Sequence, residues 1–412
     1  MLKYDRDVKK TLDRLEKAGF QTYAAGDCFL SWVLGEDALD WELITTADGE
    51  ALKTLFPESI LLDKETGARQ LSFRDEEVLL DITPAPQGIE VALKARTFTL
   101  EAVAEHPEKG LLDPCGGMQD IRDKLIRTTG DPDEQFRQDP DSMLRALRYV
   151  SELGFDLSQS VLKAIRNHYL ELMARPTEDT CTELLLLMGG AHAGKALRML
   201  ADTGLLAAVY GPDVSRKLSG NEQERYMTLV DKIEETKQIP LRRTGMLYAI
   251  LEDTRGNRAL KQLPWNDEDR THLDDAINRL LDLQLINDKV RLKQFIAKYG
   301  WDRFHYLFGL NKASRIIFEG TSFKLEAMNL MLKDIRNNGE AVLISDLAID
   351  ANDIMEAGIT DDPAQAEQLL EDVLAKVHKD PRNNVREPLL KLAKKYKRNP
   401  FASKTRYVRW IR

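Results

Sequence analysis

Acidic side chains in the first third of the chain are placed to bind a divalent cation. Asp40 and Glu42 flank a tryptophan in "DWE", and residues two apart on a strand point to one face of a sheet. Asp81 lies in "LLDIT", on a candidate neighbouring strand. Converging carboxylates repel unless a cation joins them, and Mg²⁺ prefers oxygen ligands. Two such ions can hold the attacking and leaving oxygens in nucleotidyl transfer, whereas the alternative is a solvated acidic strand face.

A turn at Gly26 could place a phosphate beside these carboxylates. In "YAAGDCFLSW" an apolar run stops at Gly26 and continues into a helical pattern, and helix N-termini present free N–H groups to anions. The next residue is Asp27, a negative charge where an anionic ligand would sit. A simpler interpretation is that Asp27 caps the helix.

These residues lie in the only part of the chain that has strand patterns. Short β-type runs cover 21–26, 41–46, 70–75 and 78–83, and helical patterns cover 3–18, 27–34 and 48–56. From Asp139 onward the pattern is helical almost throughout. The sequence therefore predicts an α+β chain, with a small α/β head followed by a long helical body.

Composition indicates a globular protein of several domains. The chain has 412 residues, of which 43% are hydrophobic and 31% charged. No apolar run approaches the roughly 20 residues that a membrane span needs, and the charged amphipathic N-terminus has no secretory signal pattern. Three widely separated cysteines favour neither a disulfide framework nor a zinc module, so we expect a cytoplasmic protein without membrane partners.

Charge is distributed unevenly along the chain. Residues 1–90 carry 10 basic and 19 acidic side chains, whereas the last 22 residues carry nine basic side chains and no acidic one. Aromatic residues are interleaved with these basic ones, which suits phosphate contact and base stacking. Candidate RNA-binding residues are therefore Lys394, Lys395, Lys397 and Arg398, although a solvated basic helix end fits equally well.

The head resembles the class II tRNA nucleotidyltransferases, which are the CCA-adding enzymes and their poly(A) polymerase relatives, and the resemblance is to the Bacillus type of these enzymes. The motifs that carry it are "YAAGDCFLSWVLGEDALDWELITTA", "ARTFTLEAVA" (95–104), "LLDPCGGMQDIRDKLIRTTGDPDEQF" (111–136) and "RQDPDSMLRALRYVSELGF" (137–155). Two later segments, at 195–211 and 343–359, are also similar to a Bacillus-type enzyme, so the resemblance covers nearly the full chain.

This resemblance implies a fold and a set of partners. It implies a DNA polymerase beta-like nucleotidyltransferase head with a small mixed sheet (1–130), followed by an elongated helical neck that holds the nucleotide template (131–195), a body (196–305) and a tail (306–412). The expected partners are the acceptor arm and 3′ end of tRNA, together with CTP and ATP, and the expected cofactor is Mg²⁺.

The resemblance also assigns roles to individual residues. The catalytic residues would be Asp40, Glu42 and Asp81, with the metal held by Asp40 and Glu42, and the nucleotide-binding residues would be Gly26, Arg96, Asp139, Arg145 and Arg148. Arg145 and Arg148 also have a structural interpretation, because residues three apart on one helix can tie neighbouring elements together.

Several working positions of the family are altered in this chain. Leu30 and Ser31 stand where the family has the Arg-Asp pair that binds the triphosphate. Thr97 stands in place of an Asp, Glu101 in place of an Asn, and Ser142 in place of the template Arg. A serine cannot supply the fork of donors with which an arginine pairs to a base edge. The motifs are therefore degenerate, and transfer of CMP or AMP to the tRNA 3′-OH is expected to be impaired or altered.

Three functions fit these observations. The first is a tRNA nucleotidyltransferase, acting on CMP or AMP donors or with a changed specificity. The second is a catalytically lapsed paralogue that still binds the tRNA 3′ end, and the third is a scaffold that no longer binds RNA.

Overall fold

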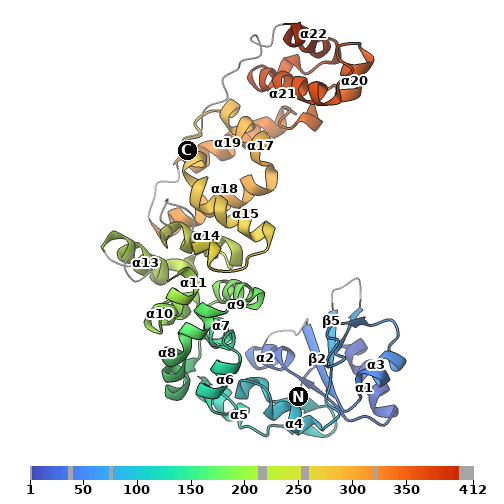
Figure 1. The fold of residues 1–412 in the computed structure, drawn as a ribbon, viewed down its shortest axis with the longest axis vertical. Coiled ribbons are helices and arrows are strands. Elements are labelled where there is room, and N and C mark those ends of the chain that lie inside the picture. Colours follow the sequence, from blue (N-terminus) through green and yellow to red (C-terminus); the bar gives the residue numbers. More distant parts are fainter. Residues whose placement is uncertain are drawn as a thin grey trace. The chain divides into compact units, whose positions relative to one another are not determined.

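The protein forms two compact units, Met1–Pro212 and Asp213–Arg412, which are described separately (Figure 1). The computed structural model describes residues 2–35, 40–73, 78–211, 220–251, 259–318 and 323–398. Every described strand lies in the first unit, and the described elements of the second unit are all helical. The predicted α+β class, a head with a mixed sheet followed by helices, is confirmed.

A seven-stranded mixed sheet forms the centre of the head, in the order β3-β4-β5-β2-β1-β6-β7. β2 and β5 pair in parallel, and the other neighbours are antiparallel. The strands are β1 (Thr22–Ala25), β2 (Asp40–Thr45), β3 (Ile60–Leu61), β4 (Arg69–Phe73), β5 (Val78–Pro84), β6 (Ala104–His106) and β7 (Gly110–Leu112).

The register of the central strands places two predicted site residues side by side. Glu42 of β2 lies opposite Asp81 of β5 and, on its other side, opposite Ala25 of β1. Along β5 the residues alternate between fully buried and half-buried positions, as a strand between two environments requires. Asp81 falls on the half-buried face, and Leu80 and Ile82 are buried on the other.

Short helices surround the sheet. They are α1 (Arg6–Lys17), α2 (Asp27–Leu34), α3 (Gly49–Leu55), α4 (Ile89–Lys94), the 3₁₀ turn η1 (Thr99–Glu101) and α5 (Gly117–Asp123). α1 begins where the Asp5 side chain accepts from the Asp7 amide, and it buries Val8, Leu12 and Leu15 at helical spacing. α1 and α2 both contact β1 and β2.

The rest of the first unit is helical apart from one small parallel pair, β8 (Leu125–Ile126) with β9 (Asp156–Leu157). The helices are α6 (Pro132–Gln138), α7 (Ser142–Leu153), α8 (Gln159–Ala174), α9 (Glu178–Gly189), α10 (Ala193–Asp202) and α11 (Leu205–Tyr210). α7 packs against α9 and α10, and α8 packs against α6 and α11. α7 is therefore the helix that connects the head motifs to the following helices.

The second unit contains the remaining helices. They are α13 (Asn221–Lys232), η2 (Ile233–Glu235), α14 (Pro240–Leu251), η3 (Ala259–Lys261), α15 (Asp267–Asn278), α16 (Leu280–Gln284), α17 (Lys289–Tyr299), α18 (Trp301–Ile317), α19 (Phe323–Asn337), η4 (Ile344–Asp346), α20 (Ala351–Glu356), α21 (Pro363–Lys379), η5 (Pro381–Asn383) and α22 (Arg386–Arg398). α21 packs against α17, α20 and α22 around Ile354, Leu370, Val373 and Leu389. Among the described helices, none has the length and apolar character needed to cross a membrane.

The finer domain boundaries stay predictions. The boundaries expected after residues 130 and 195 fall within the first unit, and the one expected after residue 305 falls within the second.

Candidate active site

A cavity of about 500 Å³ in the first unit collects most of the predicted catalytic and nucleotide-binding residues. It lies between the strand ends of the head, the segment 95–101 and α7. Its lining includes Gly26, Glu42, Asp81, Arg96, Arg145 and Arg148. The side chain of Asp40, the third predicted carboxylate, lies outside the described part of the chain, although its backbone belongs to β2.

Position 26 requires a glycine, both because of its backbone conformation and because the Glu42 side chain lies against it. Gly26 has φ 71° and ψ −142° and occupies the N-cap position of α2, so the expectation that Asp27 caps this helix is wrong; Asp27 is its first residue. A Cβ on Gly26 would overlap the Oε2 atom of Glu42. A side chain is excluded both by the positive φ and by the carboxylate that lies against the turn.

Glu42 is held by an arginine and a hydroxyl. Arg96 Nη2 and Thr83 Oγ1 both donate to Glu42 Oε1, the latter at 3.0 Å. The Glu42 and Arg96 side chains are only 18% and 29% exposed. Burial alone would lower the pKa of Arg96, but the charge and hydrogen bond of Glu42 outweigh it and raise that pKa. Arg96 therefore stays positively charged beside the Glu42 carboxylate.

Asp81 also has a partner within the sheet. Gln70 of β4 lies directly opposite Asp81 and donates from Nε2 to Asp81 Oδ1 at 2.8 Å. Gln70 and Thr83 are not among the site residues predicted from the sequence. Gln70 and Thr83 could have been found only from their positions on strands that lie beside the carboxylates Glu42 and Asp81.

The Mg²⁺ site expected at Asp40 and Glu42 stays a prediction, because the side chain of Asp40 lies outside the described residues. A Mg²⁺ ion takes oxygen ligands at about 2.1 Å and tolerates little departure from octahedral geometry. Arg96 already supplies the positive charge at Glu42, and Gln70 occupies an oxygen of Asp81. Among the residues whose side chains are described, no group of three or more His, Cys, Asp or Glu is arranged for a metal.

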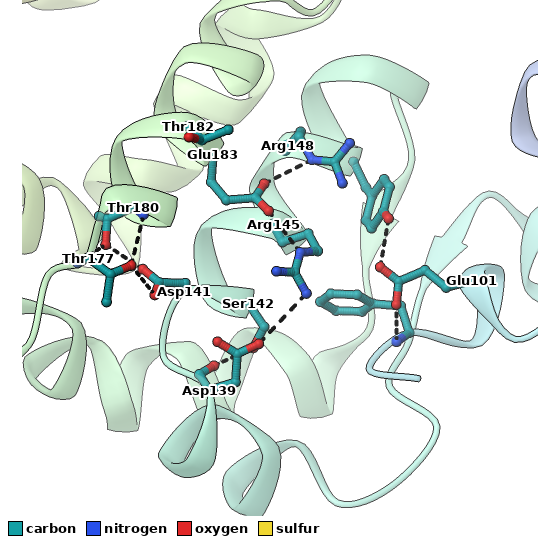
Figure 2. Close-up of polar contacts among 12 residues, drawn as sticks. Glu101, Asp139, Asp141, Ser142, Arg145, Arg148, Thr177, Thr180, Thr182 and Glu183 are labelled. Atoms are coloured by element: carbon teal, nitrogen blue, oxygen red, sulfur yellow. Dashed lines mark hydrogen bonds and ion pairs between the residues drawn. The ribbon is translucent and has the colours of Figure 1, made fainter. Parts of the chain in front are cut away.

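Arg145 and Arg148 of α7 share one buried glutamate on α9 (Figure 2). Arg145 Nε donates to Glu183 Oε1 at 2.8 Å, and Arg148 Nε donates to Glu183 Oε2 at 2.9 Å. Glu183 is only 7% exposed. Both arginines line the cavity and also join α7 to α9, as their structural interpretation predicted. Their predicted role in nucleotide binding stays a prediction.

The predicted template position is occupied by a buried serine. Ser142 is fully buried at the start of α7, and its hydroxyl donates to the carbonyl oxygen of Asp139 at 2.6 Å. The Asp139 carboxylate remains half-exposed, 3.7 Å from Arg145 Nη1. The serine hydroxyl therefore holds the turn before α7 and presents no fork of donors to a base.

Two further carboxylates, Asp141 and Glu101, organise this region. The sequence marked Glu101 only as an altered position of the motif, and Asp141 was not predicted. Asp141 accepts from the hydroxyls of Thr177, at 2.8 Å, and Thr180, so that it holds the first turn of α9 against α7 (Figure 2). Glu101 accepts from the Tyr149 hydroxyl at 2.7 Å and from the Phe98 amide at 3.1 Å. Burial raises the pKa of Glu101, although these hydrogen bonds oppose the shift.

The candidate RNA-binding residues belong to the second unit. Lys394, Lys395, Lys397 and Arg398 lie in the last turns of α22, and all four are exposed. Lys397 Nζ donates to the carbonyl oxygen of Ile359, so its amine also holds α22 to the turn after α20. The interleaved aromatic residues Phe401, Tyr407 and Trp410 lie outside the described residues.

Comparisons with known proteins agree with this fold. A family model described as the probable RNA and SrmB-binding site of polymerase A matches residues 154–218. The CCA-adding enzyme of Bacillus licheniformis is 35% identical over 217 residues, which cover 49% of this chain and 55% of that protein. The CCA-adding enzyme of Staphylococcus aureus is 27% identical, covering 71% and 73%. The match to the Bacillus licheniformis enzyme thus spans little more than half of its length.

Solved structures show the same fold over nearly the whole chain. The crystal structure of the Bacillus stearothermophilus CCA-adding enzyme in complex with CTP matches with a TM-score of 0.73 at 20% identity, covering 97% of this chain and 100% of that one. The Thermotoga maritima CCA-adding enzyme complexed with tRNA matches with a TM-score of 0.56 at 18% identity, covering 94% and 95%. The chain is thus similar to the class II CCA-adding enzymes in part of its sequence and in its fold.

Proposed function

We propose that this protein binds the 3′ end of tRNA and that its nucleotidyl transfer is impaired. The nominal reaction of the family is attack of the tRNA 3′-OH on the α-phosphate of CTP or ATP, with release of pyrophosphate. The observation that carries the proposal is the ion pair between the Arg96 guanidinium and the Glu42 carboxylate, two residues that line the cavity.

This ion pair is expected to weaken both the binding of Mg²⁺ and the binding of the triphosphate. Mg²⁺ would have to displace Arg96 from Glu42, and separating a half-buried ion pair leaves two charges uncompensated. The charge of Arg96 is at the same time compensated by Glu42, which weakens its attraction for a phosphate although other N–H donors of the guanidinium remain. We therefore expect weak Mg²⁺ affinity and weak triphosphate binding in the unmodified chain.

Base selection is expected to be lost as well. Ser142 donates inward to the Asp139 carbonyl, and Arg145 is held by Glu183. A base edge that reaches this site would leave polar groups unpaired, at a cost of about 1–3 kcal/mol for each buried group. Asp139 alone does not distinguish C from A.

The tRNA partner is proposed from the relatives and from the basic end of α22. Lys394, Lys395 and Arg398 are exposed cations that can contact phosphates, and Lys397 is exposed although its amine is bonded to Ile359. The place of action proposed for such a protein is the cytoplasm.

A second candidate function is Mg²⁺-dependent transfer of CMP or AMP. It is favoured by the size of the cavity, about 500 Å³, and by the two arginines of α7 that still line it. In that case Arg96 would move from Glu42 to the triphosphate when the nucleotide enters.

Filter binding tests the proposed partner. We expect tRNA that lacks its CCA end to bind at least tenfold more tightly than an unrelated hairpin of equal length. The logarithm of its binding constant should fall linearly with the logarithm of the salt concentration. The variant Lys394→Glu/Lys395→Glu should weaken binding and reduce the salt slope, whereas Lys379→Glu, an exposed lysine at the end of α21, serves as a control. Equal affinity for tRNA and hairpin would overturn the proposal.

A further inference from the structure

Another cavity, of about 460 Å³, lies wholly within the second unit and is lined by residues of α13, α14, α16 and α18. Its buried part, here called the floor, is formed by Met246 and Ile250 of α14, which are only 1% and 4% exposed. Ala249, Leu280 and Phe318 also line the cavity and are half-buried, so the apolar surface continues from the floor toward solvent. A ligand can therefore enter from solvent and bury an apolar group.

The polar residues that line this cavity carry hydrogen-bond donors. Asn311, Ser314 and Arg315 lie on one face of α18, at the spacing that places side chains along the same side of a helix. Gln284 of α16 and Arg225 of α13 complete the polar lining. Guanidinium groups, primary amides and hydroxyls all donate, and no aspartate or glutamate is among the described residues that line the cavity. This lining therefore suits an anion.

Arg225 lies at the open side of the cavity with its charge uncompensated. Its guanidinium carbon is 5.3 Å from the centre of the Phe318 ring, so a cation–π contact holds this exposed side chain against the cavity wall. Arg225 forms no ion pair with any residue that the structure describes. An aromatic ring does not neutralise the charge as a carboxylate would. The N–H groups of Arg225 can therefore form a forked pair of hydrogen bonds to an oxyanion.

Two half-buried side chains add donors from the neighbouring helices. Gln284 Nε2 donates to Asn311 Oδ1 at 3.3 Å, which orients the Gln284 amide. A primary amide nitrogen has two hydrogens, so this bond leaves one N–H of Gln284 for a ligand. Ser314 contributes a hydroxyl, whose hydrogen can rotate toward an acceptor.

We propose that this cavity binds a small organic phosphate, with the phosphate at Arg225 and the apolar body of the ligand on the floor. A terminal phosphate has three acceptor oxygens, so it can accept from Arg225, Gln284 and Ser314 together, whereas a carboxylate has only two oxygens. Inorganic phosphate would leave the floor unfilled, and an uncharged apolar molecule would leave Arg225 without a counter-charge. The volume lies in the range of small-molecule sites, about 300–1,000 Å³.

Two sources can supply this chemistry, namely a free phosphorylated metabolite or the terminal nucleotide of an RNA strand. The inference goes beyond the proposed function, because it depends neither on the cavity of the head nor on the basic residues of α22. Its test uses neither tRNA nor turnover, so its failure would leave the proposed function untouched.

Calorimetric titration of the full chain tests the site with naphthyl phosphate, naphthol and inorganic phosphate as separate probes. We expect naphthyl phosphate to bind about tenfold more tightly than either other probe, because it alone uses both the floor and the donors. Arg225→Gln, at an exposed position, should weaken naphthyl phosphate about tenfold, the equivalent of one charge-assisted hydrogen bond, and leave naphthol unchanged. Arg225→Lys keeps the charge without the fork and should lose about threefold.

Two further variants complete the design. Arg336→Gln, at an exposed arginine of α19 that does not line the cavity, is the matched control and should leave every affinity unchanged. Ala249→Leu extends a lining side chain and should weaken naphthyl phosphate about fivefold more than it weakens inorganic phosphate.

The outcomes that overturn the inference are explicit. The first is a loss in Arg225→Gln no larger than in Arg336→Gln, which would place the phosphate elsewhere. The second is inorganic phosphate binding as tightly as naphthyl phosphate, which would mean that the floor takes no part. A short single-stranded RNA with a terminal phosphate identifies the source. Binding at least tenfold tighter than that of naphthyl phosphate, and weakened by Arg225→Gln, indicates an RNA end, and weaker or equal binding indicates a free organic phosphate.

Discussion

Glu183 is the residue whose removal should most disturb the joint between α7 and α9. Its carboxylate accepts from Arg145 and from Arg148, at 2.8 and 2.9 Å, and it is nearly buried. Glu183→Ala would leave two guanidinium groups without their shared partner. Removing one partner of a buried ion pair typically costs about 3–5 kcal/mol, mainly because the remaining charge is uncompensated.

The partners that remain reduce this magnitude. Arg148 keeps Glu152 at 3.2 Å, and Arg145, whose side chain is 27% exposed, keeps Asp139 at 3.7 Å. We therefore expect Glu183→Ala to lower the free energy of local unfolding by about 2–3 kcal/mol. Glu183→Gln keeps an acceptor oxygen and should lose about half as much, since the charge goes but one hydrogen bond stays.

Hydrogen exchange followed by mass spectrometry measures this effect without interference from the second unit. Peptides from α7 and α9 should exchange about 30- to 150-fold faster in Glu183→Ala, which is the equivalent of 2–3 kcal/mol. Glu178→Ala, at an exposed glutamate of the same helix, is the matched control. A change in Glu183→Ala no larger than in this control would refute the reasoning that Glu183 joins the two helices.

Three further predictions concern other parts of the chain. Gly26→Ala should lower the free energy of unfolding by about 1–3 kcal/mol in urea titration, because the position has a positive φ and the new Cβ would overlap Glu42. A loss of unfolding free energy below about 0.5 kcal/mol, the range of an ordinary surface substitution, would contradict the argument that this turn requires a glycine. Thr180→Val removes a donor from the buried Asp141 and should cost about 1–3 kcal/mol in thermal unfolding, whereas the exposed Thr182→Val should be neutral. His378 binds a proton more weakly folded than unfolded, so the second unit should lose up to about 3 kcal/mol as the pH falls from 6.5 to 4. His378→Gln should flatten that profile, and an unchanged slope would argue against the buried neutral ring.

The sequence predicted the strands of the site well because they are long and strongly patterned. The runs at 41–46 and 78–83 correspond to β2 and β5, and their predicted adjacency is confirmed by the pairing of Glu42 with Asp81. β6 and β7 were missed because strands of three residues carry too little periodicity to detect. The Gly26 turn was found because a glycine between a strand and a helix is a local signal.

The partners of the site residues depend on contacts distant in sequence and could not be predicted. Arg96 lies 54 residues from Glu42, and Glu183 lies 38 residues from Arg145. Glu183 carried one usable signal, since it is a single acidic residue just before the apolar run "LLLLM" of α9. Pattern reasoning can mark such a residue as unusual, but only the packing of α7 on α9 shows which charges it compensates.

The central proposal is that the Arg96–Glu42 ion pair impairs nucleotidyl transfer while tRNA binding is retained. Its most direct test is single-turnover incorporation of labelled CMP and AMP into tRNA lacking its CCA end, with excess protein, Mg²⁺ and CTP or ATP. The account predicts incorporation at or near the background of the Asp40→Ala variant under conditions in which the tRNA is fully bound. Efficient incorporation that disappears in Asp40→Ala would contradict it and establish the second candidate function, a working nucleotidyltransferase.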